Sequence, residues 1–224
     1  MRRIATFVAA LAVALWAAAL AQPLSPGPIT PQAARLAALL DATNVETLWP
    51  AGFHVDWRSG APEGPRLSTP GAHTHCSAFA AAVAERLGIY LLRPPDHAQD
   101  WLANAQERWL NGPDAAGWHR LGRLADPGAS LRAVALANQG KLVVAVYFQP
   151  PRETPGGPKE RSGHIAIVRP SDKSPALIDS EGPDVIQAGT VNYRQVALRE
   201  GFAGHKEGLA SGDIEYFWHD VQLP

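Results

Sequence analysis

The sequence predicts an α+β domain in which helices come first and a mainly antiparallel β-sheet follows. Helical patterns end at about residue 138, and the apolar period then changes from helical to strand-like. Hydrophobic residues make up 46% of the 224 residues and charged residues 18%, which is the composition of a globular chain with a core. We expect one domain, residues 22–224, with an N-terminal helical extension.

Four helices are predicted from apolar stripes and from residues typical of helix ends. They are expected from Pro31 to about Thr43 after an N-cap at Thr30, from Cys76 to about Leu87 before Gly88, from a cap at Asp96 to Asn111-Gly112, and from Ser130 to Asn138 before Gly140. Trp101 and Trp109 are interpreted as core residues of an amphipathic helix rather than as platforms for sugars or peptides.

The strands are predicted from β-prone apolar runs between segments rich in Pro and Gly. They are expected at Leu142–Phe148, Gly163–Arg169, Val185–Ala188 and Ile214–His219, with a further short strand at Val55–Trp57 and a loop at Pro150–Ser162. Because the helix that begins at Cys76 carries an apolar stripe, we expect it to cover one side of this sheet.

The charge balance and the first residues indicate an exported protein that does not bind nucleic acid. Lys and Arg total 20 against 21 Asp and Glu, whereas nucleic-acid-binding proteins are strongly basic. Arg2 and Arg3 precede an uncharged apolar run, and Ala19-Leu20-Ala21 has the pattern that signal peptidase cleaves. Residues 1–21 are therefore expected to be a signal peptide, with an uncleaved anchor as the alternative. Cleavage would leave a periplasmic or secreted protein without a membrane span.

The single cysteine, Cys76, is the candidate nucleophile. One cysteine forms no intramolecular disulfide, and a lone thiol in an oxidising compartment is expected to be either deeply buried or useful. Thr74 is a plausible N-cap, which would place Cys76 in the first turn of its helix, where unpaired backbone N–H groups favour a thiolate. Cys76 also lies one turn before Phe79, on the stripe that faces the sheet.

His164 is the candidate base and Gln187 the candidate group that orients it. Strand alternation places His164 on the face of Ala166 and Val168, and we expect these small residues to let the Cys76 helix approach closely. A Cys–His pair needs a third polar group that fixes the imidazole. The next strand offers Gln187, a polar residue in an otherwise apolar segment, and the alternatives are Asp179, Glu181 and Asn192.

A metal site is the competing interpretation of the histidines near Cys76. His73, His75 and Cys76, together with His164, could supply ligands for Zn²⁺. No second ligand pair stands at metal spacing elsewhere, so neither a metal nor an organic cofactor is expected. His75 is expected at the surface, with a place in the substrate groove as the alternative.

Two motifs resemble those of the NlpC/P60 and CHAP families. His75-Cys76-Ser77-Ala78-Phe79 looks like their cysteine helix, and Gly163-His164-Ile165-Ala166-Ile167-Val168 resembles their histidine strand. The resemblance spans about Thr74 to Gly189 and implies a papain-like core, with Gln187 at the position of the polar residue that completes the site. Relative to these families, the segment from Tyr90 to Asn138 is expected to be an insertion. The resemblance also implies a hydrolase that cleaves amide bonds in peptidoglycan peptides, either as an endopeptidase or as a sugar–peptide amidase.

The alternative from another functional class is a catalytically inactive protein that binds the cell envelope on the same fold. Gln187 offers the imidazole only a neutral hydrogen bond, and His75 stands where many NlpC/P60 members have an acidic residue. Such a protein would keep ligand binding when Cys76 is replaced by Ser.

Overall fold

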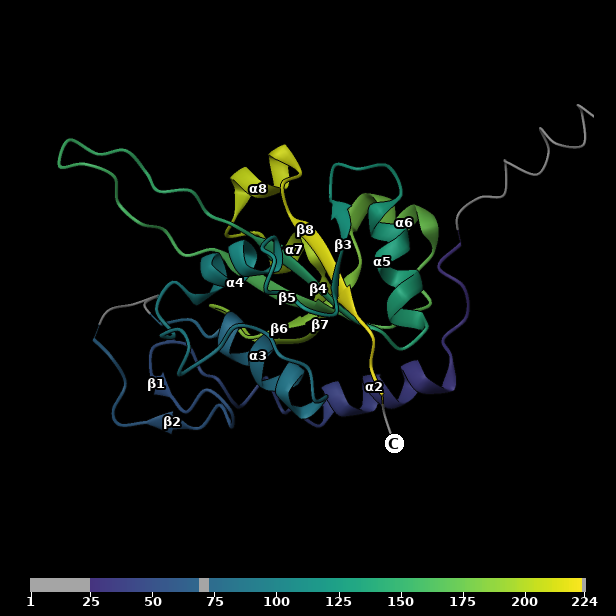
Figure 1. The fold of residues 1–224 in the computed structure, drawn as a ribbon, viewed down its shortest axis with the longest axis horizontal. Coiled ribbons are helices and arrows are strands. Elements are labelled where there is room, and N and C mark those ends of the chain that lie inside the picture. Colours follow the sequence, from purple (N-terminus) through teal and green to yellow (C-terminus); the bar gives the residue numbers. More distant parts are fainter. Residues whose placement is uncertain (1–24, 69–72, 223–224) are drawn as a thin grey trace, which may run out of the picture.

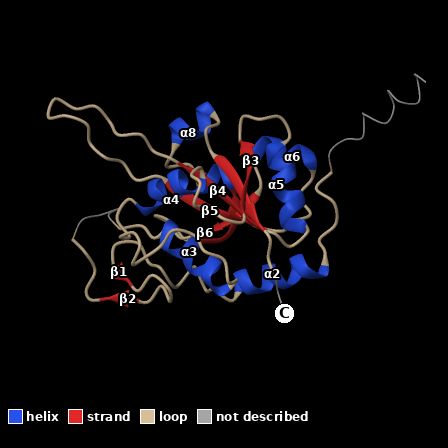
Figure 2. Ribbon diagram, in the orientation of Figure 1, coloured by secondary structure: helices blue, strands red, loops and turns tan. Residues whose placement is uncertain are grey.

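The computed structural model describes residues 25–68 and 73–222, where six antiparallel strands form a central sheet between helices (Figure 1, Figure 2). The predicted α+β class is confirmed at this level, while the predicted signal peptide, residues 1–21, lies outside the described residues. Within the described ranges, no helix combines the length and the apolar character needed to cross a bilayer.

The sheet has the strand order β3-β8-β4-β5-β6-β7. Its strands are β3 (Trp118–Arg123), β4 (Leu142–Tyr147), β5 (His164–Val168), β6 (Asp184–Gln187), β7 (Tyr193–Ala197) and β8 (Glu215–His219), and a separate pair is formed by β1 (His54–Val55) and β2 (Pro62–Glu63). The helices are α2 (Pro31–Asp41), α3 (Cys76–Arg86), α4 (Leu102–Leu110), α5 (Ala129–Asn138), α6 (Pro175–Glu181), α7 (Leu198–Gly201) and α8 (Lys206–Ser211).

Each face of the sheet carries its own hydrophobic cluster. On one face, α2 and α3 pack on alternate residues of the central strands, including Val144, Ile165 and Ile167. On the other face, α5 and the end of α7 pack on the intervening residues, including Ala166 and Val168. Figure 1 shows α2 and α3 below the sheet, α8 above it and α5 to its right. The prediction that the Cys76 helix covers one side of the sheet is therefore confirmed.

The predicted helices exist, but the N-cap of one and the start of another were assigned wrongly. The Thr30 hydroxyl caps α2 as predicted, accepting a 3.2 Å hydrogen bond from the backbone N–H of Ala33. Helix α3 begins at Cys76, but its N-cap is His75 rather than Thr74, and no side chain caps it. Helix α4 begins after Trp101 rather than near Asp96, whose carboxylate instead accepts a hydrogen bond from a tyrosine hydroxyl.

The four main predicted strands are confirmed as β4, β5, β6 and β8, while the two edge strands were missed. Strands β3 and β7 lie at opposite ends of the sheet, and charged or small residues interrupt their apolar pattern. Edge strands are partly hydrated, so they lack the continuous apolar run that marks a buried strand. The segment expected as an insertion thus supplies one edge of the sheet and, through α5, cover for one face.

The connection between β4 and β5 is a long arm. Residues 148–163 extend away from the body of the protein, as the green loop in Figure 1 shows. Arg152 and Lys159 pair across the arm in an isolated antiparallel bridge. The base of the arm returns to the sheet immediately before His164, so the conformation of the arm bears directly on the candidate site.

Candidate active site

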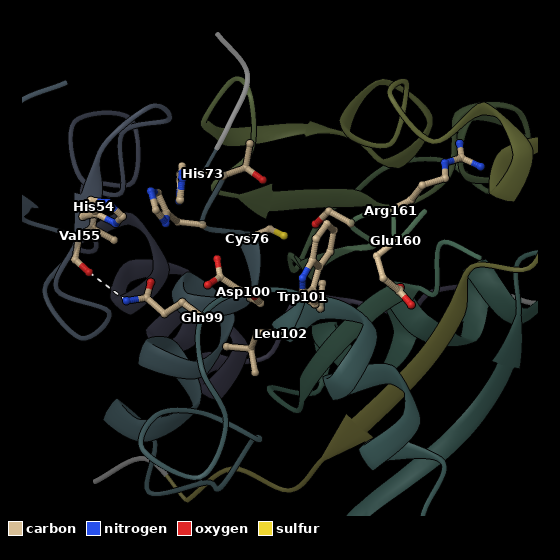
Figure 3. Close-up of a pocket in the computed structure, with 15 residues that line it drawn as sticks. His54, Val55, His73, Cys76, Gln99, Asp100, Trp101, Leu102, Glu160 and Arg161 are labelled. Carbon is tan, nitrogen blue, oxygen red and sulfur yellow. Dashed lines mark hydrogen bonds between the residues drawn. The ribbon is translucent and has the colours of Figure 1, made fainter. Parts of the chain in front are cut away.

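Cys76 is the first residue of α3 and lines a cavity of about 480 Å³. Only 2% of the residue is exposed, yet its sulfur faces this cavity, with Asp100 and Trp101 on the adjoining wall (Figure 3). Because the first N–H groups of a helix have no acceptor within that helix, the start of α3 favours negative charge on the sulfur.

Gln187 fixes the orientation and the tautomer of His164. The Gln187 side-chain amide donates a 3.2 Å hydrogen bond to the carbonyl oxygen of Gly201, so its own oxygen, Oε1, is turned toward His164. This oxygen lies 2.9 Å from Nε2 of His164 and accepts a hydrogen bond from the Nε2–H group. The other ring nitrogen, Nδ1, is thereby left for the hydrogen-bonding contact with Cys76.

The pKa values of Cys76 and His164 shift in the directions that favour a thiolate–imidazolium pair. Burial raises the pKa of the Cys76 thiol, but the charge and hydrogen bond of His164 outweigh burial and bring the pKa below its ordinary value. Backbone N–H groups of Ile165 and Ser77 add to this lowering. Burial lowers the pKa of His164, but the Cys76 charge, together with hydrogen bonds to Cys76 and Gln187, raises it above its ordinary value.

The site depends on close packing around Gln187. A Cβ placed on Gly201 would lie 2.6 Å from the Gln187 Oε1 atom that faces His164. A Cβ on Gly189 would lie 3.3 Å from the Gln187 amide nitrogen and 3.5 Å from the His164 ring. At Gly201 in particular, any larger residue would displace the amide, so the absence of a side chain holds the orienting group in place.

The prediction that the Cys76 helix packs on the same face of β5 as His164 is wrong. His164 shares a face with Ala166 and Val168 as alternation predicts, but these two residues belong to the cluster on the side away from α3. Helix α3 packs instead on the Ile165 face. Since His164 is the first residue of β5, the two side chains meet at the end of the strand, each coming from a different face of the sheet.

Among the four candidates for the third residue, Gln187 is the one that bonds His164. Asn192 instead holds the β6–β7 turn against the N-terminal segment, donating to the carbonyl oxygens of Val45 and Leu48 at 2.8 and 2.9 Å. Glu181, at the end of α6, forms an ion pair with a lysine, and Asp179 lies on the same helix. Neither α6 residue lines the cavities beside the pair.

Two aromatic residues missed in the sequence surround the imidazole of His164. The ring of His205 stacks on it, with centroids 5.2 Å apart and planes inclined by 16°. Phe202 meets it edge to face at 4.6 Å. Both lie beside α7 and α8, whose four and six residues are too few for a periodic pattern. The available signal was one phenylalanine between Gly201 and Gly204 and one histidine directly after Gly204.

A second cavity, of about 490 Å³, lies on the other side of the pair. His164, Gln187 and His205 line it, whereas Cys76 lines the first cavity. Thr74 and Ser162 line both cavities, so the sulfur and the imidazole sit at the boundary between them. This geometry could place the two parts of a substrate on either side of a bond under attack.

The histidines before Cys76 do not form a metal site in the described part of the chain. Residues 25–68 and 73–222 contain no group of three or more His, Cys, Asp or Glu side chains placed to hold an ion. His75 was expected at the surface, but it is 5% exposed, and its Nε2 lies 3.0 Å from the carbonyl oxygen of Phe53. Burial lowers its pKa, so the ring is neutral at pH 7. The rings of His73 and His54 contact edge to face at 4.9 Å.

Trp101 is not a core residue, contrary to the prediction. It is 49% exposed, lines the Cys76 cavity and precedes α4 with a left-handed backbone, at φ 58°. A large residue with positive φ is strained, and such strain is often found at functional sites. Trp109 packs against the core as predicted and contacts Tyr90 edge to face at 5.4 Å.

No family model matches this chain, and no curated protein is significantly similar to it. Any function assigned to the chain therefore depends on its own residues and their geometry.

Proposed function

We propose that this chain is an exported cysteine hydrolase that cleaves amide bonds of peptidoglycan peptides on a papain-like core. The observation that carries the proposal is the ordered contact of Cys76, His164 and Gln187 at the boundary between two cavities. A nucleophile, a base and a group that orients the base, in this sequence of contacts, are what nucleophilic amide hydrolysis requires.

In the first step, the Cys76 thiolate attacks the carbonyl carbon of the amide. A carbon–sulfur bond forms, and the carbonyl electrons move to oxygen to give a tetrahedral intermediate. The intermediate collapses as the carbon–nitrogen bond breaks, and protonated His164 donates its Nδ1 proton to the leaving amine. The products of this step are a free amine and an acyl group held on the sulfur.

In the second step, His164 acts as a base toward water. It takes one proton from the water, whose oxygen attacks the thioester carbonyl. When this second intermediate collapses, the carboxylic acid leaves and the sulfur departs as a thiolate, which again pairs with the imidazolium. Gln187 holds the ring throughout, because its oxygen accepts from Nε2 in both protonation states.

The start of α3 is suited to stabilise the oxygen anion of both intermediates. The first backbone N–H that bonds within the helix is that of Phe79, which donates to the carbonyl oxygen of His75 at 2.8 Å. The three N–H groups before it, those of Cys76, Ser77 and Ala78, have no acceptor within the helix. Preorganised N–H donors of this kind typically contribute several kcal/mol to acyl transfer, so we assign the oxyanion site here.

The substrate class follows from the resemblance of the cysteine and histidine motifs to NlpC/P60 and CHAP sequences. These families mostly act on bacterial cell-wall peptides, and the expected export of this chain would bring it to that substrate. The two cavities, of about 480 and 490 Å³, are large enough for a few residues of a peptide on either side of the scissile bond.

The test is the digestion of purified peptidoglycan and its soluble peptides, followed by mass spectrometry. We expect new amine and carboxyl ends in equal number, with the gain of one water for each cleavage. Cys76→Ser should reduce the rate by about 1,000-fold or more, while Ser180→Ala, an exposed hydroxyl on α6, should leave it unchanged. Cleavage that persists in Cys76→Ser would refute the proposal.

The same experiment separates the hydrolase from the envelope-binding alternative. A binding protein would bind peptidoglycan equally well with and without the Cys76→Ser substitution and would release no new amine from any wall preparation. Addition of EDTA tests the zinc alternative, since a metal-dependent hydrolase would lose activity and this cysteine mechanism would retain it.

A further inference from the structure

We infer that His205 is a positioning residue for the base, which holds the His164 ring in plane and stabilises its protonated form by stacking on it as a neutral imidazole. This inference rests on the proposed function, and it assigns a role to a residue outside the Cys76, His164 and Gln187 set. Its evidence is the stack itself, the hydrogen bonds that hold His205, and the charges around both rings.

The contacts of His164 leave its ring faces to aromatic neighbours. In the plane of the ring, one nitrogen faces Cys76 and the other bonds Gln187. His205 lies nearly parallel to this plane at 5.2 Å, while Phe202 meets the ring edge to face at 4.6 Å. Rotation of the imidazole about its Cβ–Cγ bond would break the stack and both in-plane contacts together, so His205 restricts the rotation that would misalign the base.

His205 is itself fixed by a chain of hydrogen bonds. Its Nδ1 lies 3.1 Å from Oε1 of Gln149. The Gln149 amide nitrogen donates to Glu207 at 2.8 Å, and Glu207 also accepts from Arg161 at 2.7 Å. Because the Gln149 nitrogen is committed to Glu207, its oxygen must face His205, which therefore carries its hydrogen on Nδ1.

Burial and the charges around His205 keep its ring neutral. Burial and the nearby positive charges of His164 and Arg161 together lower its pKa to about 3. The facing titratable groups are Tyr147 on β4, Glu207 on α8 and Glu200, which lines the same cavity. A neutral aromatic ring beside an imidazolium attracts it, whereas a second charged imidazole would repel it.

The packing of a neutral ring on the base has a defined consequence for the Cys76 thiol. Stabilisation of the His164 cation also stabilises the thiolate beside it, because the two charges form together. Loss of the His205 ring should therefore raise the pH at which Cys76 becomes reactive. A cation on an aromatic face in a partly buried site is worth enough to move this pH by about half a unit to one unit.

The experiment measures the rate of Cys76 alkylation by iodoacetamide from pH 4 to pH 10 in four proteins. These are the wild type, His205→Ala, His205→Phe and the control His119→Ala, which removes an imidazole stacked on Trp218 at 4.5 Å on a distant strand. We expect His205→Ala to move the pH midpoint of the alkylation rate upward by about half a unit to one unit. The midpoint of His205→Phe should lie close to that of the wild type, because an aromatic face remains beside His164. The control should match the wild type.

A wild-type midpoint in His205→Ala would overturn the inference, as would equal shifts in His205→Ala and His119→Ala. If His205→Ala does not fold, Gln149→Leu replaces it: loss of the bond that holds His205 should move the midpoint upward, and an unchanged midpoint again overturns the inference. Failure of the proposed function gives a different result. In that case the wild-type thiol itself has an ordinary pKa that His164→Ala does not change.

Discussion

The most informative single substitution is Gln187→Leu, which removes the group that orients the base but keeps the volume of the side chain nearly constant. Gln187 is 3% exposed and His164 is 5% exposed, so bulk solvent has little access to the place of the lost partner. The Nε2–H of His164 is left buried without an acceptor, at a cost of about 1–3 kcal/mol in the free energy of unfolding. For a chain of this size, we expect the melting temperature to fall by about 3–10 °C.

Gln187→Leu also disfavours the protonated form of the base. Gln187 accepts from His164 in both protonation states, but the bond from the cation contributes about 1.5–3 kcal/mol and the bond from the neutral ring about 0.5–1.5 kcal/mol, so the difference lowers the pKa of the imidazolium by about one unit. The sign follows from the coupling of the pair: a less stable imidazolium means a less stable thiolate. The pH midpoint of Cys76 alkylation should therefore move upward by a similar amount.

The assay follows the iodoacetamide reaction across pH, alongside thermal unfolding of each protein. Gln195→Leu is the matched control, because Gln195 is an exposed glutamine whose amide donates to Asp184 at 2.9 Å outside the site. A folded Gln187→Leu protein with the wild-type midpoint would refute the reasoning, since Gln187 would then contribute packing alone.

Three further predictions use the same assays. His164→Ala should return the Cys76 thiol to a raised pKa, because burial then acts without its compensating charge, and alkylation below about pH 8.5 should nearly cease. Trp101→Ala should raise KM for cell-wall peptides several-fold with an unchanged alkylation midpoint, and equal KM values would argue against a substrate contact. Gly201→Ala should shift the midpoint in the same direction as Gln187→Leu, because the new methyl group displaces the amide, and a wild-type profile would contradict the packing argument.

The sequence was sufficient to predict the elements that carry the site. Cys76 opens a helix with an apolar stripe, and His164 opens a continuous β-prone run, so local periodicity marks both positions. Gln187 could be proposed because it is a polar residue in an apolar strand. Each of these signals lies within one element, and the structure contains those elements at the predicted positions.

The features that the sequence did not predict depend on contacts between elements. His205 lies beside two helices too short to show a period, and only the tertiary fold brings it against the base. Trp101 was interpreted as core because its spacing fits a helix, but it is the N-cap of α4, with a left-handed backbone, and its side chain is exposed. Alternation alone could not indicate which layer of helices would cover which face of β5.

The meeting of Cys76 and His164 at the end of a strand has a consequence for the folding chain. The thiol belongs to the hydrophobic cluster under α3, whereas the neighbours of the imidazole belong to the cluster on the opposite face. A folding intermediate in which only one cluster has formed would hold an ordinary, weakly nucleophilic cysteine. The proposed thiolate–imidazolium pair therefore requires both layers to have closed on the sheet, so it belongs to the native state alone.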